Sequence, residues 1–79
     1  MTRNFKFDDF RTGAKTAISV EVTERTTFME LCGLLVEALA PITDVKTLSL
    51  GVFGRGSLVV LDTAHNVQIG RVLSAPSGV

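Results

Sequence analysis

The sequence of 79 residues contains no tryptophan, no tyrosine, one cysteine and one histidine. A single cysteine, Cys32, cannot form a disulfide within the chain, so the sequence does not indicate a secreted, disulfide-stabilised domain. A reducing cytoplasm is the expected location. One cysteine and one histidine, with no paired ligands at metal-binding spacing, also cannot complete a tetrahedral metal site. We therefore expect neither a metal nor a cofactor.

The sequence also lacks net charge and a long apolar run. Eight Lys and Arg residues balance eight Asp and Glu residues, and a neutral chain has no overall field to attract nucleic acid or an anionic membrane. The apolar runs are shorter than the roughly 18 residues that span a bilayer, and no signal peptide is recognisable. We expect one domain over residues 1–79, with residues 74–79 as a flexible tail.

One segment, residues 27–40, has a long helical period. Thr27 followed three residues later by Glu30 is a capping-box pattern, which predicts a helix start. Pro41 disfavours helical geometry in the residue before it, so the helix is expected to end near Ala40. Gly33 costs about 1 kcal/mol relative to alanine inside a helix, which a close backbone approach would offset. The expected inward face holds Phe28, Leu31, Cys32, Leu35, Ala38, Leu39 and Ile42.

Two-residue alternation, which is typical of half-buried strands, appears on both sides of this helix. It predicts strands at residues 5–8 and 16–22, joined by a turn at Gly13. Further strands are expected at residues 45–53, 58–61 and 67–73, separated by turns at 54–57 and 62–66, where Asn66 tolerates left-handed geometry. The side chains expected to face inward are Phe5, Phe7, Ile18, Val20, Val22, Leu48, Leu50, Val52, Val67 and Ile69.

Three features depart from simple alternation. Phe10 falls out of phase with the first strand, which indicates either a bulge after Asp8 or a position in the turn. Arg71 interrupts the phase of the last strand. Residues 58–61 form a continuous aliphatic run, so we expect both faces of that strand to be covered.

This order of elements predicts an α+β domain, ββαββ(β), with a single helix packed on a four- to five-stranded, mainly antiparallel sheet. The β-grasp arrangement fits the order. The first half also resembles ubiquitin-like proteins in a Phe-rich first strand, the Thr12-Gly13 turn with Lys15-Thr16 following, the strand end Val20-Glu21-Val22, and Thr27 opening the helix. The resemblance implies a β-grasp fold. It does not imply conjugation, because paired terminal glycines are absent from Pro76-Ser77-Gly78-Val79.

A catalytic site would have to use His65, with Asp62 to orient it and Ser57 or Cys32 as nucleophile. Ser57 and Asp62 lie at opposite ends of one expected strand, about 15 Å apart at roughly 3.3 Å per residue, and Cys32 is expected in the core. We interpret His65 as a solvated turn residue and expect the protein not to be an enzyme. The Gly54-Arg55-Gly56 segment precedes a strand rather than a helix, which favours a hairpin turn over a phosphate loop.

Hydrophobic residues make up 46% of the chain, more than a small core covers, so we expect some to contact a partner or a second copy. The favoured function is a non-enzymatic protein–protein interaction module, an adaptor or inhibitor acting through a helix flank or sheet face. The alternative is a self-assembling subunit, joined through the helix flank or by edge pairing of the last strand. A small nucleic-acid-binding protein is less favoured, given the neutral charge. The residues expected to bind the partner are Met29, Leu34, Val36, Phe53 and Arg55.

Overall fold

The computed structural model describes residues 1–52 and 57–75. The elements in chain order are β1 (Thr2–Asp9), β2 (Lys15–Glu21), α1 (Phe28–Thr43), β3 (Leu48–Val52), β4 (Ser57–Asp62) and β5 (Val67–Ser74). The predicted order of two strands, one helix and further strands is confirmed, with three strands after the helix. Within the described residues, no helix is long and apolar enough to cross a membrane.

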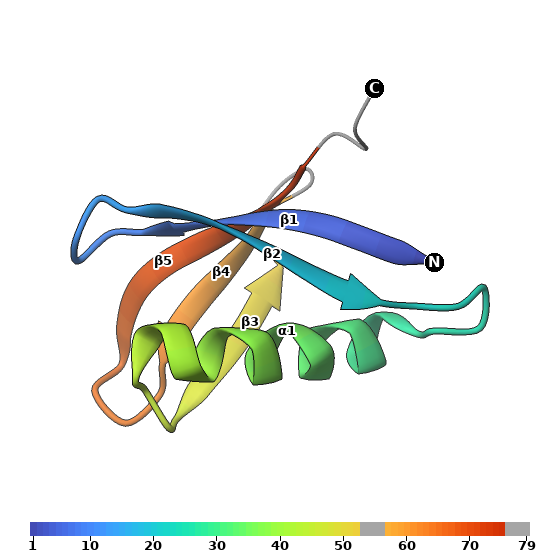
Figure 1. The fold of residues 1–79 in the computed structure, drawn as a ribbon. Helices are drawn as coiled ribbons and strands as arrows, with labels where there is room; N and C mark the ends of the chain where they lie inside the picture. Colours follow the sequence, from blue (N-terminus) through green and yellow to red (C-terminus); the bar gives the residue numbers. More distant parts are fainter. Residues whose placement is uncertain (53–56, 76–79) are drawn as a thin grey trace.

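The strands form one sheet in the order β2-β1-β5-β4-β3, and each neighbouring pair is antiparallel. The helix lies across one face of this sheet (Figure 1), so the predicted α+β class with a single helix on an antiparallel sheet is confirmed. This strand order does not confirm the exact β-grasp topology. The last strand, β5, lies between β1 and β4, so of the two expected routes to assembly, edge pairing of the last strand is excluded. The edges are β2 and β3.

The core lies between α1 and the inner face of the sheet. On the helix, Leu31, Leu35 and Leu39 recur at four-residue steps and are buried, as their spacing predicts. Phe28 and Ile42 were expected to share this face but are exposed, and Cys32 and Ala38 are only half-buried. The fourth buried residue of the helix is Thr43, four positions after Leu39. The buried apolar residues of the sheet and its flanks are Phe5, Phe7, Ile18, Val20, Val22, Leu58, Val60, Ile69 and Val72.

The start of α1 agrees with the sequence, whereas its end does not. Thr27 and Glu30 form the predicted capping box, in which the Thr27 side chain accepts from the Glu30 backbone amide at 3.2 Å. The helix continues through Pro41 to Thr43, so the prediction that it stops near residue 40 is wrong.

Two local features explain why the helix tolerates Pro41. The carbonyl that loses its amide partner belongs to Glu37, and both residues are exposed, so solvent reaches this side of the helix. The last turn is then closed by two hydrogen bonds: Thr43 Oγ1 donates to the Leu39 carbonyl at 2.9 Å, and the Asp44 amide donates to the Ala40 carbonyl at 2.9 Å. Asp44 ends the helix in left-handed geometry with φ of 55°.

The structure resolves the irregularities in the strands. Phe10 lies in the turn after β1, and its amide donates to the Ile69 carbonyl at 2.9 Å. The shifted phase around Arg71 comes from a register irregularity opposite Val60 and Leu61, which places both Ile69 and Gly70 among the buried residues. Gly13 and Asn66 have the predicted positive φ values, 76° and 52°.

The expectation that both faces of β4 are covered is wrong. Leu58 and Val60 are buried beneath the helix, whereas Val59 and Leu61, on the opposite face, are only half-buried. The helix covers one face of the sheet, and no described element packs on the other (Figure 1). Val52 and Val67 were also expected to face the core, but both are exposed because they lie at strand ends beyond the helix stripe.

Gly33→Ala is expected to stabilise the protein by about 0.5–1 kcal/mol, because alanine restricts the unfolded chain and favours helix. A Cβ atom placed on Gly33 meets nothing within 4 Å among the atoms of the described residues, so no close approach within this chain requires the glycine. Urea denaturation of the two proteins measures the difference. A loss of stability would show that the helix packs more closely at Gly33 than the structure indicates.

Candidate functional site

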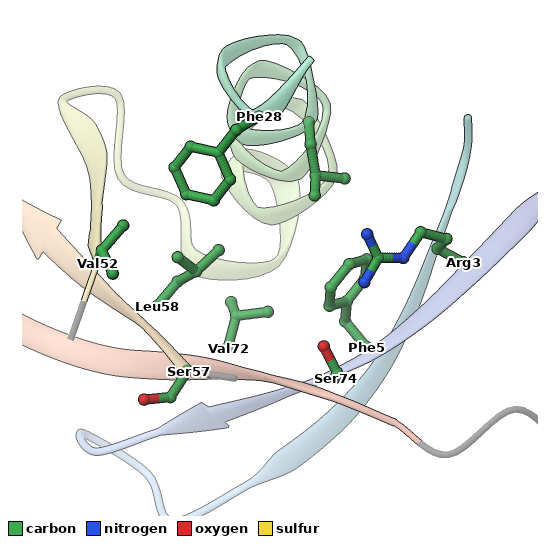
Figure 2. A pocket seen from close by; sticks show the side chains of 9 residues that line it. Arg3, Phe5, Phe28, Val52, Ser57, Leu58, Val72 and Ser74 are labelled. Atoms are coloured by element: carbon green, nitrogen blue, oxygen red, sulfur yellow. The ribbon is translucent and has the colours of Figure 1, made fainter. Parts of the chain in front are cut away.

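A groove opens between the first turn of α1 and the inner face of the sheet (Figure 2). Its volume is about 260 Å³. Buried apolar side chains form the floor, and more exposed side chains from the helix and from β1, β3, β4 and β5 surround the opening. The floor consists of Phe5, Leu31, Leu58 and Val72, and the rim consists of Arg3, Phe28, Val52, Ser57 and Ser74.

Strand register explains why the groove forms at this end of the fold. Val72 and Leu58 face each other across β5 and β4, and Leu58 faces Val52 across β4 and β3. In the next inner-face position of β5, Ser74 lies opposite Phe5. A serine there fills less space than a large apolar residue, and the sheet leaves the first helical turn incompletely covered. Phe28 is therefore 52% exposed and Val52 is 68% exposed.

A second hollow adjoins the groove on the side of the β2–α1 connection. We call it the side hollow; its volume is about 350 Å³. It shares Arg3, Phe28 and Leu31 with the groove, so the two form one continuous surface around Phe28. The remaining lining residues are Met1, Val22, Thr23, Thr26 and Thr27.

Arg3 is the only charged side chain among the described residues that line the groove or the side hollow. Its guanidinium carbon lies 5.2 Å from the centre of the Phe5 ring, which is a cation–π distance. Figure 2 shows the guanidinium at the rim in front of that ring. The surface thus combines an apolar floor with one positive charge at its edge.

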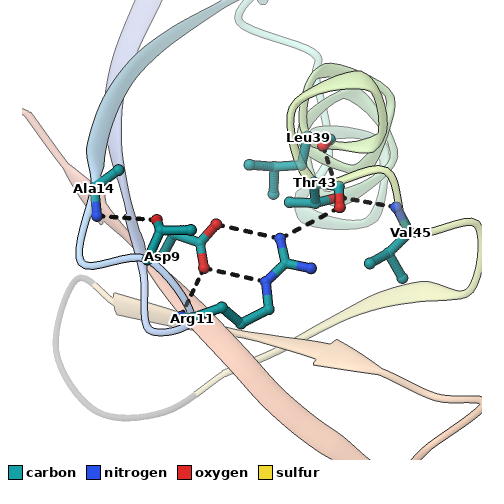
Figure 3. A network of polar contacts seen from close by, with 7 residues as sticks. Asp9, Arg11, Ala14, Leu39, Thr43 and Val45 are labelled. Atoms are coloured by element: carbon teal, nitrogen blue, oxygen red, sulfur yellow. Dashed lines mark hydrogen bonds and ion pairs between the residues drawn. The ribbon is translucent and has the colours of Figure 1, made fainter.

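A second cluster of polar groups lies at the opposite end of the helix (Figure 3). Asp9 ends β1 and is only 6% exposed. Its carboxylate accepts from the Arg11 amide at 2.9 Å and from Arg11 Nε and Nη2 at 3.2 Å each. Arg11 Nη2 also donates to the Thr43 carbonyl at 3.3 Å. These contacts tie the β1–β2 turn to the end of α1, which gives the cluster a structural role.

Asp9→Asn is expected to lower the free energy of unfolding at neutral pH by about 1–2 kcal/mol. This value is near the low end for hydrogen bonds to charged groups, because the Arg11 side chain is half exposed and solvent screens its charge. Hydrogen bonding by the Arg11 side chain lowers the pKa of the Asp9 carboxyl from its usual value. Because the pKa of the Asp9 carboxyl is lower in the folded than in the unfolded protein, its stabilisation is complete at a pH above the unfolded-state pKa of about 3.9. It is lost as the pH falls through the lower pKa of the folded state.

Urea denaturation between neutral and acidic pH tests this. The difference in unfolding free energy between wild type and Asp9→Asn should shrink as the pH falls below the pKa of the Asp9 carboxyl in the unfolded chain. Glu24→Gln, at an exposed position with no ion pair among the described residues, is the control and should track wild type. An Asp9→Asn difference that stays constant with pH would contradict the assigned role of the ionised carboxylate.

Of the five residues predicted to bind a partner, the structure describes Met29, Leu34 and Val36, all on α1. Met29 is 83% exposed on the first turn of α1, next to Phe28 in sequence. Leu34 is half-buried and packs against the core, and Val36 is also half-buried. Phe53 and Arg55 lie outside the described residues. Met29 is thus the most accessible of the five among those that the structure describes.

Sequence reasoning missed Arg3 and Phe28 as surface residues of a site. Arg3 precedes Phe5 by two residues, so continuing the strand alternation toward the N-terminus would have placed it on the inner face. Phe28 was assigned to the core because it is in phase with the leucine stripe. Its phase is correct, but phase does not reveal that the sheet provides little cover at that level.

Of the groups considered for catalysis, His65 and Asp62 are in contact, whereas Ser57 and Cys32 lie elsewhere. His65, in the turn after β4, places its Nδ1 2.8 Å from Oδ2 of Asp62, the last residue of β4. Asp62 also accepts a hydrogen bond from Thr47 Oγ1 at 2.7 Å. This bond, and to a smaller extent the one from His65, lowers the pKa of the Asp62 carboxyl. Ser57 begins β4, at the strand end away from Asp62. Cys32 is half-buried on α1, where burial raises the pKa of its thiol.

Comparison of the chain with protein-family models, with curated proteins and with solved structures finds no match. A function must therefore be inferred from the groove and the charges around it.

Proposed function

We propose that this chain is a non-enzymatic protein-binding module, an adaptor or small inhibitor, that holds a partner against the groove and the first turn of α1. The observation that carries this proposal is the exposure of Phe28 and Val52 at the rim of a floor of buried apolar side chains. Binding hot spots are typically large apolar or aromatic groups in pockets from which water is excluded. An open groove of this kind receives a partner side chain more readily than it encloses a small molecule.

Met29 extends the proposed surface along the helix. It follows Phe28 directly and is more exposed, so a partner that covers the groove would also cover this side chain. Apolar groups gathered on one part of a surface are typical of interaction sites, whereas single scattered ones are not. The helix flank that the sequence suggested is thus retained, and its centre is moved from Leu34 and Val36 to Phe28.

The experiment is affinity capture from the native host with wild type, Phe28→Ser and Val67→Ser as baits. Val67 is 50% exposed and begins β5, at the end opposite the strand positions that line the groove, which makes it a matched control. We expect a specific partner protein to be retained by wild type and Val67→Ser and lost with Phe28→Ser. Retention of every partner by Phe28→Ser would contradict the proposed surface.

A self-assembling subunit is the second candidate, and the edge strand β3 favours it. Its residues, Leu48–Val52, carry no charge and include no proline, and such an edge is poorly protected against pairing with another strand. Two copies of β3 could pair antiparallel about a two-fold axis. Sedimentation equilibrium at micromolar concentration tests for the homodimer, and Ser49→Lys, on the sheet face away from the core, should dissociate one formed through this edge.

A further inference from the structure

The charge on the groove is of one sign. Arg3 has no ion pair with any residue that the structure describes, and it lines both the groove and the side hollow. Arginine binds carboxylates through planar, paired hydrogen bonds, which makes an unpaired guanidinium beside an apolar pocket a suitable contact for an acidic group.

Of the three acidic residues adjacent in sequence to the lining, Glu21 and Glu30 are engaged elsewhere, and the exposed Glu24 forms no ion pair with any described residue. Glu21 accepts from Thr2 Oγ1 and lies 3.8 Å from the N-terminal amine. Glu30 accepts from the Thr27 hydroxyl and amide at 3.0 and 3.3 Å in the capping box. None of these carboxylates forms an ion pair with Arg3 in the part of the chain that the structure describes, so the positive charge of the groove remains available to a partner.

Ser74 adds a second hydrogen-bond donor at the same place. It lies opposite Phe5 in the register of β5 and β1, and Arg3 lies over the Phe5 ring. Figure 2 shows the Ser74 hydroxyl and the Arg3 guanidinium on the Phe5 side of the groove, away from Val52. One side of the groove therefore donates hydrogen bonds, while Phe28, Val52 and Leu58 make the other side apolar.

We propose that the partner segment inserts a large apolar side chain over Leu58 and Val72 and places an Asp or Glu, one or two residues away, against Arg3 and Ser74. This inference rests on the proposed protein-binding function and specifies which chemical groups the partner presents. The apolar side chain supplies the buried contact. The carboxylate matches the charge of the groove, which selects among partners and fixes the direction of the bound segment.

A library of random short peptides displayed on phage, selected against the full chain, tests the inference. We expect enriched peptides to combine a large aliphatic or aromatic residue with a nearby Asp or Glu. Synthetic peptides from the enriched set would then be measured by fluorescence anisotropy against wild type, Arg3→Glu, Lys6→Glu and Phe28→Ser. Lys6 is an exposed β1 residue on the opposite sheet face, so Lys6→Glu matches the charge change without altering the groove.

Binding should weaken about tenfold or more with Arg3→Glu, equivalent to at least about 1.4 kcal/mol, and should change little with Lys6→Glu. Replacing the acidic peptide residue by lysine should restore affinity for Arg3→Glu, which isolates the pair. Thermal melts confirm that each variant is folded.

The other outcomes separate the two proposals. Peptides without acidic residues that bind wild type and Arg3→Glu equally, but not Phe28→Ser, would leave the protein-binding groove in place and overturn the acidic partner. Absence of enrichment, or peptides unaffected by either groove variant, would count against both.

Discussion

Gly70→Ala is expected to destabilise the protein by about 3 kcal/mol or more, at or beyond the upper range for overpacked cores. Gly70 is buried in β5, where it lies opposite Asp9 of β1 and Val60 of β4. A Cβ atom there would overlap the Asp8 carbonyl oxygen and come within 2.7 Å of Phe7 Cε1. The carbonyl is held by the sheet and Phe7 is fully buried, so neither obstacle can move away cheaply.

Gly51→Ala is the matched control for Gly70→Ala, since it places the same methyl group on a strand glycine in β3. No atom lies within 4 Å of a Cβ built on Gly51 among the described residues, and we expect a change within about 0.5 kcal/mol, as for other surface substitutions. Urea denaturation of both variants measures the contrast. Equal effects at the two positions would mean that the close approach of β1 to Gly70 is not maintained in solution.

Leu35→Ala is expected to cost about 2–5 kcal/mol, the range for removing a buried leucine side chain and leaving a cavity. Leu35 is 0% exposed and occupies the centre of the leucine stripe on α1. The sequence alone already indicates this position, and the structure shows it fully enclosed by the sheet. Its truncation removes contacts on which the packing of the only described helix depends.

Met29→Ala provides the comparison for Leu35→Ala within the same helix. Met29 is mostly exposed, and we expect its truncation to change stability by less than about 0.5 kcal/mol. Chemical denaturation monitored by circular dichroism suffices for both. A Leu35→Ala loss as small as that of Met29→Ala would show that α1 packs on the sheet through a different face.

The elements themselves are predictable because their signals are local. The capping box at Thr27 and Glu30 and the spacing of Leu31, Leu35 and Leu39 lie within a few turns of one helix, and two-residue alternation defines the strands in the same way. The continuation of the helix past Pro41 could not be predicted from the proline itself, because hydrogen bonds from Thr43 and Asp44 to carbonyls of the last turn hold that turn in helical geometry.

The order of strands is not contained in such local patterns. Alternation identifies β5 as a strand and gives its inward face, but it does not state which strands are its neighbours. The pairing of Phe7 with Val72 joins residues near opposite ends of the described chain, and no turn residue specifies it. The groove was missed for the same reason, since Arg3, Phe28 and Val52 meet only after the sheet has assembled.

The central position of β5 has a consequence for how the chain folds during synthesis. The β1–β2 hairpin and the β3–β4 hairpin can each form early, but neither contacts the other in the sheet until β5 inserts between β1 and β4. A nascent chain that has not yet released β5 from the ribosome thus exposes two half-sheets and the leucine face of α1. Non-local strand pairing of this kind is slow relative to helix formation, and exposed strand edges invite association between chains. The complete five-stranded sheet therefore assembles only after the last strand emerges.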